Sequence, residues 1–504
     1  MTQTAKVYLI GAGPGDPGLF SLKAKRCLER ADAVVYDRLA DPRILGFARK
    51  DAEIIYVGKQ SSQHTLPQDE INKLLVKLAG EGKTVARLKG GDPLVFGRGG
   101  EEALALKAAG IAFEFVPGVS SAIAVPEYAG IPVTHRKTAT SFAVITGHED
   151  PTKETSGINW KGLATGVDTL VFLMGVENIG KISEQLIANG RSANCPAAVI
   201  RWGTHPEQET LVTTVGRAYA DVKANNIKPP AIYIVGEVVN LREKLAWFDN
   251  KPLFGRTVVV TRARSQASRL SEMLEDLGAK VIEAPAIKIR AVSDYSALDK
   301  ALDAIHTYKW VIFTSANGVK YFFTRAYKAG LDARALAGTH IAAIGSGTAK
   351  ALGTYGLKAD LMPGSYIAEE LAKALKGKVA PSDRILLPRA SVAREVLPDA
   401  LRKLGAWVDV VPVYNTVADC ENKDALFAAL EAGGCMITFT SSSTVRNFMK
   451  VLAGKKDLLK NAETAVIGPV TGETLKKYGF TPTITAREFT VAGLLDAIAE
   501  YYKK

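Results

Sequence analysis

Short apolar segments rich in β-branched residues alternate with amphipathic helical stretches along the whole chain. This alternation is typical of α/β proteins, in which strands buried on both faces are covered by helices. We therefore predict an α/β fold class, and a chain of 504 residues suggests about three domains. The clearest predicted strands are VYLIGAG (7–13), AVVYD (33–37), TLVFLMG (169–175), AIYIVGE (231–237), TVVVTRA (257–263), WVIFTSA (310–316) and MITFTSS (436–442).

Several protein classes conflict with this sequence. Every stretch of about 18 residues contains charge or proline, so we expect no membrane span. The N-terminus has no long apolar segment before a small-residue cleavage site, so it does not resemble a signal peptide. The six histidines are scattered, which argues against a metal site. The cysteines lack CxxC spacing, so we expect free thiols and a cytoplasmic location; they are Cys27, Cys195, Cys420 and Cys435.

The formal net charge is +12, which permits nucleic acid, an anionic membrane surface or an acidic small molecule as a partner. The basic residues are dispersed, and no nucleic-acid-binding signature interleaves aromatic residues with them. Dispersed charge is usually a solvated surface. Where it is functional, it favours a polyanionic metabolite, so we expect no nucleic-acid partner and no membrane partner.

The chain divides near DNKPLFG (249–255), where a charged helical segment ends and a new strand begins. The second part contains an imperfect internal repeat. WVIFTSANGVKYFF (310–323) resembles MITFTSSSTVRNFM (436–449), and HIAAIGSGTAKALGTYGL (340–357) resembles TAVIGPVTGETLKKYGF (464–480). We therefore predict two similar α/β lobes in the second part, with a cleft between them.

Two glycine-rich loops in the first part are candidates for a ligand site. GAGPGDP (11–17) follows the first strand, but it lacks the third glycine of the GxGxxG pattern, and Pro14 replaces a backbone donor. An ordinary tight turn between strand and helix would also explain it. KGGDPLVFGRGG (89–100) offers bare backbone at Gly90 and Gly91, against which a ligand can lie. Asp92 can accept hydrogen bonds from an amine or a ribose.

A series of motifs extends this interpretation: GAGPGDP, VVYDRL, VGK, RLKGGDPLVFGRGGEE, PGVSSA, GIPVTHR and TGHE. In this order they resemble a uroporphyrinogen-III C-methyltransferase of the tetrapyrrole methylase family, over about residues 5–248. The resemblance implies two α/β subdomains with an S-adenosylmethionine site between them. It also implies methylation of uroporphyrinogen III at carbons 2 and 7 to give precorrin-2, and a homodimer formed through this half.

The resemblance assigns cofactor contacts to residues in these loops and in later strands, namely Pro14, Gly90, Gly91, Asp92, Val95, Ser120, Ser121, Met174, Gly203 and Ala231. The family often has Thr-Ala where this chain has Ser120 and Ser121. The register of Gly203 depends on the variable-length segment before it. A methionine that ends a strand, as Met174 does, is also typical of core packing.

The implied chemistry is mainly a positioning problem, because the methyl group of a sulfonium is already activated. The methylated pyrrole must then lose a proton, a task that suits a carboxylate. The resemblance places this role on Asp37, and a proton-returning or carboxylate-steering role on Lys59. From the sequence alone, Asp37 could equally cap a turn, and Lys59 could be a surface lysine.

Uroporphyrinogen is an octacarboxylate, so basic residues in or beside the matched loops are candidates for binding it. These candidates are Arg38, Arg87, Arg98, His135 and Arg136. Ordinary surface salt bridges would explain the same arginines.

The second half is similar to uroporphyrinogen-III synthase over about residues 255–500. The similarity lies in VVVTRARSQASRLSEMLEDLGAKVIEAPAIKI (258–289), FTSANGV, AIGSGTAKAL, LLPRASVAREVLPDALRKLGAWVDVVPVYNT, FTSSSTV and VIGPVTGETL. It implies a methyltransferase domain of residues 1–250 followed by a synthase domain of residues 251–504. Within the synthase domain, lobe 1 would span about 255–289 plus 416–504, and lobe 2 about 290–414.

The synthase family closes the linear hydroxymethylbilane into a ring and inverts ring D. Loss of the terminal hydroxyl leaves an electrophilic azafulvene, so catalysis consists largely of folding the flexible substrate. The resemblance points to Tyr414 as the proton donor to the leaving hydroxyl, although a tyrosine here could also be a packing residue. We expect five further residues to line the cleft: Arg262, Ser315, Arg389, Thr440 and Ser441.

The two resemblances support each other, because the synthase product is the methylase substrate. Joining both in one chain raises the local concentration of the intermediate if the sites can face each other. The alternatives are a basic RNA-binding regulator, a methylase with another acceptor, and an NAD-dependent enzyme. We see no additional N-terminal dehydrogenase or chelatase domain, so we expect neither NAD-dependent oxidation nor insertion of iron or cobalt. The sequence leaves open whether the pathway ends in sirohaem, cobalamin or another modified tetrapyrrole.

Overall fold

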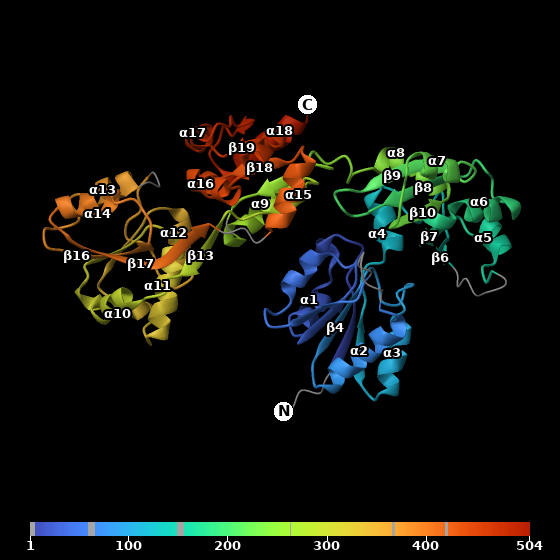
Figure 1. Cartoon of the computed structure of the whole chain (residues 1–504), viewed down its shortest axis with the longest axis horizontal. Helices are drawn as coiled ribbons and strands as arrows, with labels where there is room; N and C mark the ends of the chain where they lie inside the picture. The colour runs from blue at the N-terminus through green and yellow to red at the C-terminus, as the bar shows by residue number, and fades with distance from the viewer. Residues whose placement is uncertain are drawn as a thin grey trace. The chain divides into compact units, whose positions relative to one another are not determined.

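The computed structural model describes residues 6–58, 66–148, 156–262, 264–364, 368–418 and 422–503. It divides the chain into two compact units built of strands and helices (Figure 1). The first unit comprises Met1–Arg256, Leu274–Lys280 and Tyr502–Lys504, and the second comprises Thr257–Met273 and Val281–Tyr501. The predicted α/β class is confirmed, while the inferred domain limits stay a prediction. Across the described residues, no helix is long and apolar enough to span a membrane.

The first sheet of the first unit is parallel, with the order β3-β2-β4-β1-β5. Helix α1 (Leu22–Leu28) covers one face, and α2 (Gln68–Gly80) and α3 (Gly99–Ala108) cover the other (Figure 1). The strands are β1 (Lys6–Gly11), β2 (Ala33–Tyr36), β3 (Glu53–Tyr56), β4 (Val85–Lys89) and β5 (Ala112–Val116), and short 3-10 helices are η1 (Pro17–Leu19) and η2 (Pro42–Phe47).

The carboxyl ends of β1, β4 and β5 bring three glycine backbones into close contact. A Cβ atom on Gly118 would lie 2.4 Å from the carbonyl oxygen of Gly91, and one on Gly11 would lie 2.5 Å from the Gly118 nitrogen. Gly91 also exchanges two backbone hydrogen bonds with Gly13, of 2.7 and 3.2 Å. Only glycine permits such an approach, so these residues fix the loops that leave this edge of the sheet.

The second sheet of the first unit is mixed, with the order β6-β7-β10-β8-β9. Strand β10 is antiparallel to both β7 and β8, and β8 and β9 form an antiparallel hairpin. The apolar sequences did not reveal this direction, because strands buried on both faces have similar sequences in either orientation. The strands are β6 (Phe142–Thr146), β7 (Thr169–Leu173), β8 (Pro196–Arg201), β9 (Glu209–Thr214) and β10 (Ala231–Val235).

Helix α4 (Ser121–Tyr128) packs on one face of this second sheet through Ala122 and Val125. The other face is covered mainly by α5, α6 and α7. The remaining elements of the unit are α5 (Trp160–Gly166), η3 (Val176–Asn178), α6 (Ile179–Ala188), α7 (Ala218–Ala224), η4 (Glu237–Leu241) and α8 (Arg242–Leu245).

The second unit contains a sheet of order β12-β11-β18-β19-β20, in which β11, β18, β19 and β20 run parallel. Its strands are β11 (Thr257–Val260), β12 (Lys280–Glu283), β18 (Met436–Phe439), β19 (Glu463–Val466) and β20 (Ile484–Thr485). Its helices are α9 (Arg264–Asp276), α15 (Lys423–Ala432), α16 (Ser442–Val451), η7 (Lys456–Asn461), α17 (Pro469–Lys476) and α18 (Val491–Tyr502).

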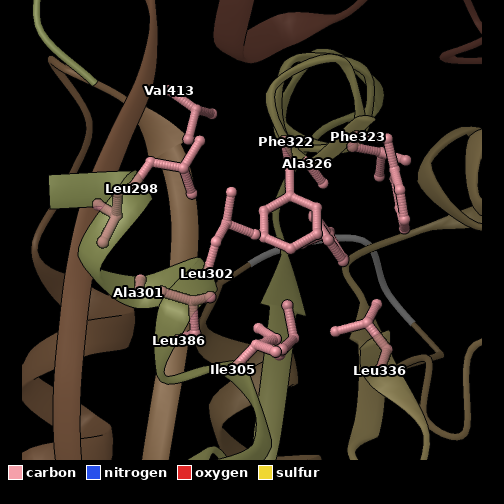
Figure 2. Packing of buried hydrophobic residues seen from close by; sticks show 14 of the residues in the cluster. Leu298, Ala301, Leu302, Ile305, Phe322, Phe323, Ala326, Leu336, Leu386 and Val413 are labelled. Carbon is pink, nitrogen blue, oxygen red and sulfur yellow. The ribbon is translucent and has the colours of Figure 1, made fainter. Parts of the chain in front are cut away.

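The other sheet of the second unit has the order β13-β17-β16-β14-β15. Its core packs α10 and α11 against the strands, and Figure 2 shows Leu298, Leu302 and Phe322 converging there. The strands are β13 (Ile287–Ala291), β14 (Trp310–Phe313), β15 (His340–Ala343), β16 (Arg384–Ala390) and β17 (Trp407–Ala418). The helices are α10 (Ser296–Asp303), η5 (Ile305–Thr307), α11 (Ala316–Lys328), η6 (Ala333–Leu336), α12 (Ser346–Gly353), α13 (Ala368–Leu375) and α14 (Val396–Lys403).

The internal repeat is confirmed as a repeated strand–helix–strand–helix motif. β14 pairs in parallel with β15, as β18 does with β19. In both copies a serine caps the first helix: Ser315 Oγ accepts the N–H of Gly318, and Ser441 Oγ accepts the N–H of Thr444. The serine at the strand end is therefore the structural signature of each copy.

We predict that Gly118→Ala destabilises the first unit by ~1–3 kcal/mol, because its Cβ would overlap the backbone of Gly91. The matched control is Gly80→Ala at the end of α2, where no atom lies within 4 Å of the added Cβ. The control should be neutral or stabilise by up to about 1 kcal/mol. Thermal unfolding measures both, and equal melting temperatures would contradict the close-contact argument.

Candidate functional site

Asp37 directly follows β2, at the sheet edge from which the glycine loops leave. Its Oδ1 accepts the N–H of Leu39 at 3.1 Å, which is the turn-capping role left open by the sequence. Its Oδ2 accepts a hydrogen bond from Nη2 of Arg87 at 3.2 Å. Both carboxylate oxygens are thus oriented, and the side chain stays 26% exposed, so a substrate can reach it.

A buried cluster of charges lies beneath Asp37. Arg87 and Lys89 point from β4 toward Glu102 on α3, whose Oε1 accepts hydrogen bonds from Arg87 Nε at 3.1 Å and Lys89 Nζ at 2.7 Å. Burial, and to a lesser extent the Arg87 charge, lowers the pKa of Lys89. Arg87 is only 3% exposed, and its predicted contact with substrate carboxylates stays a prediction. The observed contacts favour a role in holding Asp37.

Asp92 joins the second glycine loop to the loop after β5. Its Oδ1 accepts the N–H of Leu94 at 2.8 Å, and its Oδ2 accepts the N–H of Gly118 at 3.1 Å. The bare backbone of Gly91 lies against the start of α4, where Ser120 caps the helix through the N–H of Ala122. The structure thus brings together Gly90, Gly91, Asp92, Ser120 and Ser121 among the predicted cofactor residues.

The remaining predicted cofactor residues lie on several loops and strand ends. Met174 follows β7 with φ +57° and is 54% exposed, so the alternative of core packing is wrong for it. Gly203, between β8 and β9, packs against Val125 of α4, where a Cβ would lie 2.2 Å from Cγ1. Ala231 begins β10, Pro14 is half-buried in the first glycine loop, and Val95 is exposed in the second.

A polar network connects the first glycine loop to the second sheet, and the sequence did not predict it. The backbone N–H of Asp16 donates to Thr204 Oγ1 at 3.1 Å, and Asp16 Oδ2 accepts the hydroxyl of Tyr128 at 2.7 Å. Gln208 accepts the N–H of Thr204 and donates to the carbonyl of Tyr128. Burial, followed by the Asp16 contact, raises the pKa of Tyr128. The polar residues within the GAGPGDP and RWGTHPEQ loops were the sequence feature that could have indicated this network.

The basic residues proposed to bind substrate differ in their surroundings. Arg38 and Arg136 are exposed, and Arg98 forms an exposed ion pair with Glu101 at 2.7 Å. His135 Nδ1 lies 3.2 Å from the hydroxyl of Thr138. Lys59, the second predicted catalytic residue, lies outside the described residues.

In the second unit, Tyr414 lies on β17 with only 7% of its surface exposed. Its hydroxyl is 3.0 Å from Ser315 Oγ, and its ring stacks on Tyr321 with centroids 5.8 Å apart. Burial raises the pKa of Tyr414, and the Ser315 hydrogen bond opposes this shift. The hydroxyl therefore stays protonated at neutral pH, as a proton donor requires.

The other predicted cleft residues lie at strand ends of both sheets. Arg262 follows β11, and Thr440 follows the neighbouring strand β18. Ser441 comes next and caps helix α16. Burial lowers the pKa of Arg262. Arg389 is buried on β16, donates to the carbonyl of Arg394 at 2.9 Å and pairs with Glu395. Helix α16 also contacts β13 and β17, the strand that carries Tyr414.

Strand registers show that two of these arginines occupy equivalent positions. Trp310 pairs with Ile385, and Met436, its counterpart in the repeat, pairs with Val258. Arg389 lies four residues after Ile385, and Arg262 lies four residues after Val258, so the two arginines occupy equivalent positions in the two sheets. Each sheet therefore presents an arginine and a capping serine at corresponding strand ends.

Two protein-family models match the chain. The model for tetrapyrrole (corrin/porphyrin) methylases matches residues 6–219, and the one for uroporphyrinogen-III synthase HemD matches residues 268–496. The porphyrin biosynthesis protein HemD of Ruminiclostridium josui is 41% identical over 496 residues, which cover 98% of this chain and 97% of that protein.

Two further comparisons concern the first half. The S-adenosyl-L-methionine-dependent uroporphyrinogen III methyltransferase of Methanosarcina barkeri is 52% identical over 240 residues, which cover 48% of this chain and 94% of that protein. The crystal structure of a uroporphyrin-III C-methyltransferase from Thermus thermophilus, complexed with S-adenosylhomocysteine, covers 47% of this chain and 94% of its own, with 39% identity and a TM-score of 0.41.

The fold and the site define an α/β methylase joined to a two-sheet α/β module. The match along nearly the whole length identifies the family: the chain belongs to the tetrapyrrole methylases in its N-terminal half and to the uroporphyrinogen-III synthases in its C-terminal half. It is an enzyme that combines a uroporphyrinogen-III C-methyltransferase with a uroporphyrinogen-III synthase.

The ring of His205 packs against Gly15, where an added Cβ would lie 2.1 Å from Nε2. We predict that this histidine makes the stability of the first unit pH-dependent. Burial lowers its pKa below 6.5, so the unfolded chain binds the proton more readily. Stability is therefore full above pH ~6.5 and is lost as the pH falls toward the folded pKa.

Melting temperatures at pH 7.5 and 5.5 measure this effect. His205→Gln should narrow the difference between the two pH values, because each unit by which folding depresses a pKa costs about 1.4 kcal/mol at acid pH. The matched control, His148→Gln, alters an exposed histidine of the same unit and should leave the difference unchanged. If the melting temperature falls equally between pH 7.5 and 5.5 in His205→Gln and in wild type, the prediction is wrong.

Proposed function

We propose that this enzyme cyclises hydroxymethylbilane to uroporphyrinogen III with inversion of ring D, and then methylates the product at carbons 2 and 7 to give precorrin-2. The observation that carries the proposal is the oriented carboxylate of Asp37 at the sheet edge where the glycine loops meet. The full-length similarity to one relative supports the pairing of both reactions in one chain.

S-adenosylmethionine is the cofactor of the methylase half, as for the Methanosarcina barkeri relative. It supplies a methyl group already activated on a sulfonium. The residues present fit such a group: Gly91 offers bare backbone beside the start of α4, Gly90 lies against Leu39, and Val95 and Met174 offer exposed apolar surface. The predicted contacts through Pro14, Asp92, Ser120, Ser121, Gly203 and Ala231 belong to this proposal.

Asp37 acts as the base that removes the proton from the methylated ring carbon. Its charge is balanced by Arg87 on one side, while 26% of the side chain stays accessible. Exposed Arg38, Arg98 and Arg136 supply cations for the carboxylates of the substrate. Lys59 keeps its proposed proton-returning or steering role.

In the synthase half, Tyr414 donates a proton to the leaving hydroxyl. Ser315 holds the phenol in place, because its Oγ lies 3.0 Å from the Tyr414 hydroxyl and is itself fixed by the N–H of Gly318. Arg262 and Arg389 add positive charge at corresponding strand ends, and helix-capping Ser441 adds a hydroxyl beside Thr440. Hydrogen bonds and charge contacts from these residues thus fold the substrate around the single acid, Tyr414.

The wider biological setting completes the proposal. The methyltransferase domain spans residues 1–250 and the synthase domain residues 251–504. The protein works in the cytoplasm on tetrapyrroles, without a nucleic-acid partner, and forms a homodimer through its methyltransferase half. Its product enters the synthesis of sirohaem, cobalamin or another modified tetrapyrrole. Because the product of one half is the substrate of the other, fusion raises the local concentration of the intermediate.

The decisive experiment gives the purified protein hydroxymethylbilane with and without S-adenosylmethionine. With the methyl donor we expect a dimethylated product, and without it uroporphyrinogen III. Accumulation of the type I isomer, which forms spontaneously, would remove the synthase half of the proposal.

Within this assay, Asp37→Asn should lower the methylation rate by roughly 10²–10⁴-fold, since it removes the proton acceptor but keeps the shape of the side chain. Cyclisation should stay within about twofold of wild type. The control Asp51→Asn alters an exposed carboxylate paired with Arg49 and should leave both rates unchanged. Equal loss of both activities in Asp37→Asn would indicate misfolding instead of lost catalysis.

A second variant tests the synthase half. Tyr414→Phe should lower the cyclisation rate by about 10²-fold or more, because it removes the proposed proton donor, while methylation of supplied uroporphyrinogen III continues. Tyr308→Phe is a matched control: Tyr308 is 4% exposed in the same core, and its hydroxyl donates to Asp409 at 2.6 Å. If the control loses cyclisation equally, the effect of Tyr414→Phe reflects folding.

A further inference from the structure

Glu102 is a fully buried carboxylate in the first turn of α3. Its Oε1 accepts hydrogen bonds from Arg87 Nε at 3.1 Å, from Lys89 Nζ at 2.7 Å and from Gln68 Nε2 at 3.2 Å. Its Oε2 has no hydrogen-bond partner among the described residues. One oxygen atom therefore organises side chains from β4 and α2.

The guanidinium of Arg87 is fixed in three directions. Nε donates to Glu102, Nη1 donates to the carbonyl of Leu88 at 2.8 Å, and Nη2 donates to Asp37 Oδ2 at 3.2 Å. The planar fork cannot turn toward one partner without breaking the contact with another. The position of Glu102 is therefore transmitted to Asp37 through one rigid group.

The cluster is also balanced in charge. Asp37 and Glu102 supply two negative charges, and Arg87 and Lys89 supply two positive charges, with Gln68 as the neutral donor. Buried ion pairs often contribute little to stability compared with well-packed apolar residues, because both ions lose their hydration. Stability alone therefore gives little reason for two cations and a carboxylate in this core.

We propose that Glu102 is a positioning residue for methylation, which holds the Asp37 carboxylate in its reactive orientation through Arg87. The inference rests on the proposed role of Asp37 and adds a residue that does not touch the substrate. The side chain of Glu102 has no exposed surface, whereas that of Asp37 is 26% exposed. Glu102 thus acts from beneath the site.

The test compares Glu102→Gln with wild type in methylation of supplied uroporphyrinogen III. Glutamine keeps the shape but removes the charge, which leaves Arg87 and Lys89 opposed by Asp37 alone. We expect kcat to fall at least tenfold, with the KM for substrate and the Kd for S-adenosylmethionine within about threefold of wild type.

A double variant separates positioning from a general loss of structure. In an Asp37→Asn background, Glu102→Gln should cause less than a twofold further loss of kcat, because the group that it positions is already gone. The control Glu70→Gln breaks an exposed ion pair between α2 residues, Glu70 and Lys73, and should retain wild-type kcat. Independent, multiplicative losses in the double variant would overturn the proposal.

Arg87→Lys serves as the second variant if Glu102→Gln no longer binds S-adenosylmethionine. Lysine keeps the charge but cannot bridge Glu102, Leu88 and Asp37 with a planar fork, so the same loss of kcat is expected. Wild-type kcat in Glu102→Gln or Arg87→Lys, measured with an active wild-type enzyme, would overturn the positioning role alone. An inactive wild type would instead overturn the proposed function.

Discussion

The close approach of three backbones at Gly11, Gly91 and Gly118 is the constraint on which the methylase half depends. Parallel strands deliver their loops to one edge of a sheet, but only bare backbone lets those loops meet at less than ordinary side-chain distance. Asp92 then ties two of the loops together by accepting N–H groups from each. The result is a layer of closely packed main chain, and the Asp37 carboxylate, 26% exposed, lies at the same edge of the sheet.

The sequence singled out Gly90 and Gly91 as bare backbone, but it did not predict that Gly11, Gly91 and Gly118 meet. It also did not predict the charged cluster beneath Asp37. Arg87 and Lys89 stand two residues apart in RLK, and so on one face of β4, which was a usable signal of a buried polar face. What the sequence could not supply was their partner, since Glu102 comes from α3 and meets them only through the tertiary fold.

The sequence also did not reveal the exposure of Met174 or the direction of strand β10. Met174 has the sequence context of a core residue, yet the left-handed backbone after β7 turns it outward. The apolar run that became β10 gave no sign that the strand runs against its neighbours. Both features depend on the path of the chain after the strand, which apolar periodicity does not encode. The repeat, by contrast, was visible because each copy keeps its capping serine.

The two copies of that repeat explain how similar lobes can contribute unequally. Each places an arginine and a serine at corresponding strand ends, Arg262 with Ser441 and Arg389 with Ser315. In one copy the serine Oγ contacts the hydroxyl of Ser443, while in the other it contacts the phenol of Tyr414. A serine hydroxyl beside another serine offers only hydrogen bonds, whereas a buried phenol can also release a proton. In the proposed function, the acid therefore belongs to the lobe with Tyr414, and the other lobe is proposed to supply charge and hydroxyl groups for binding carboxylates.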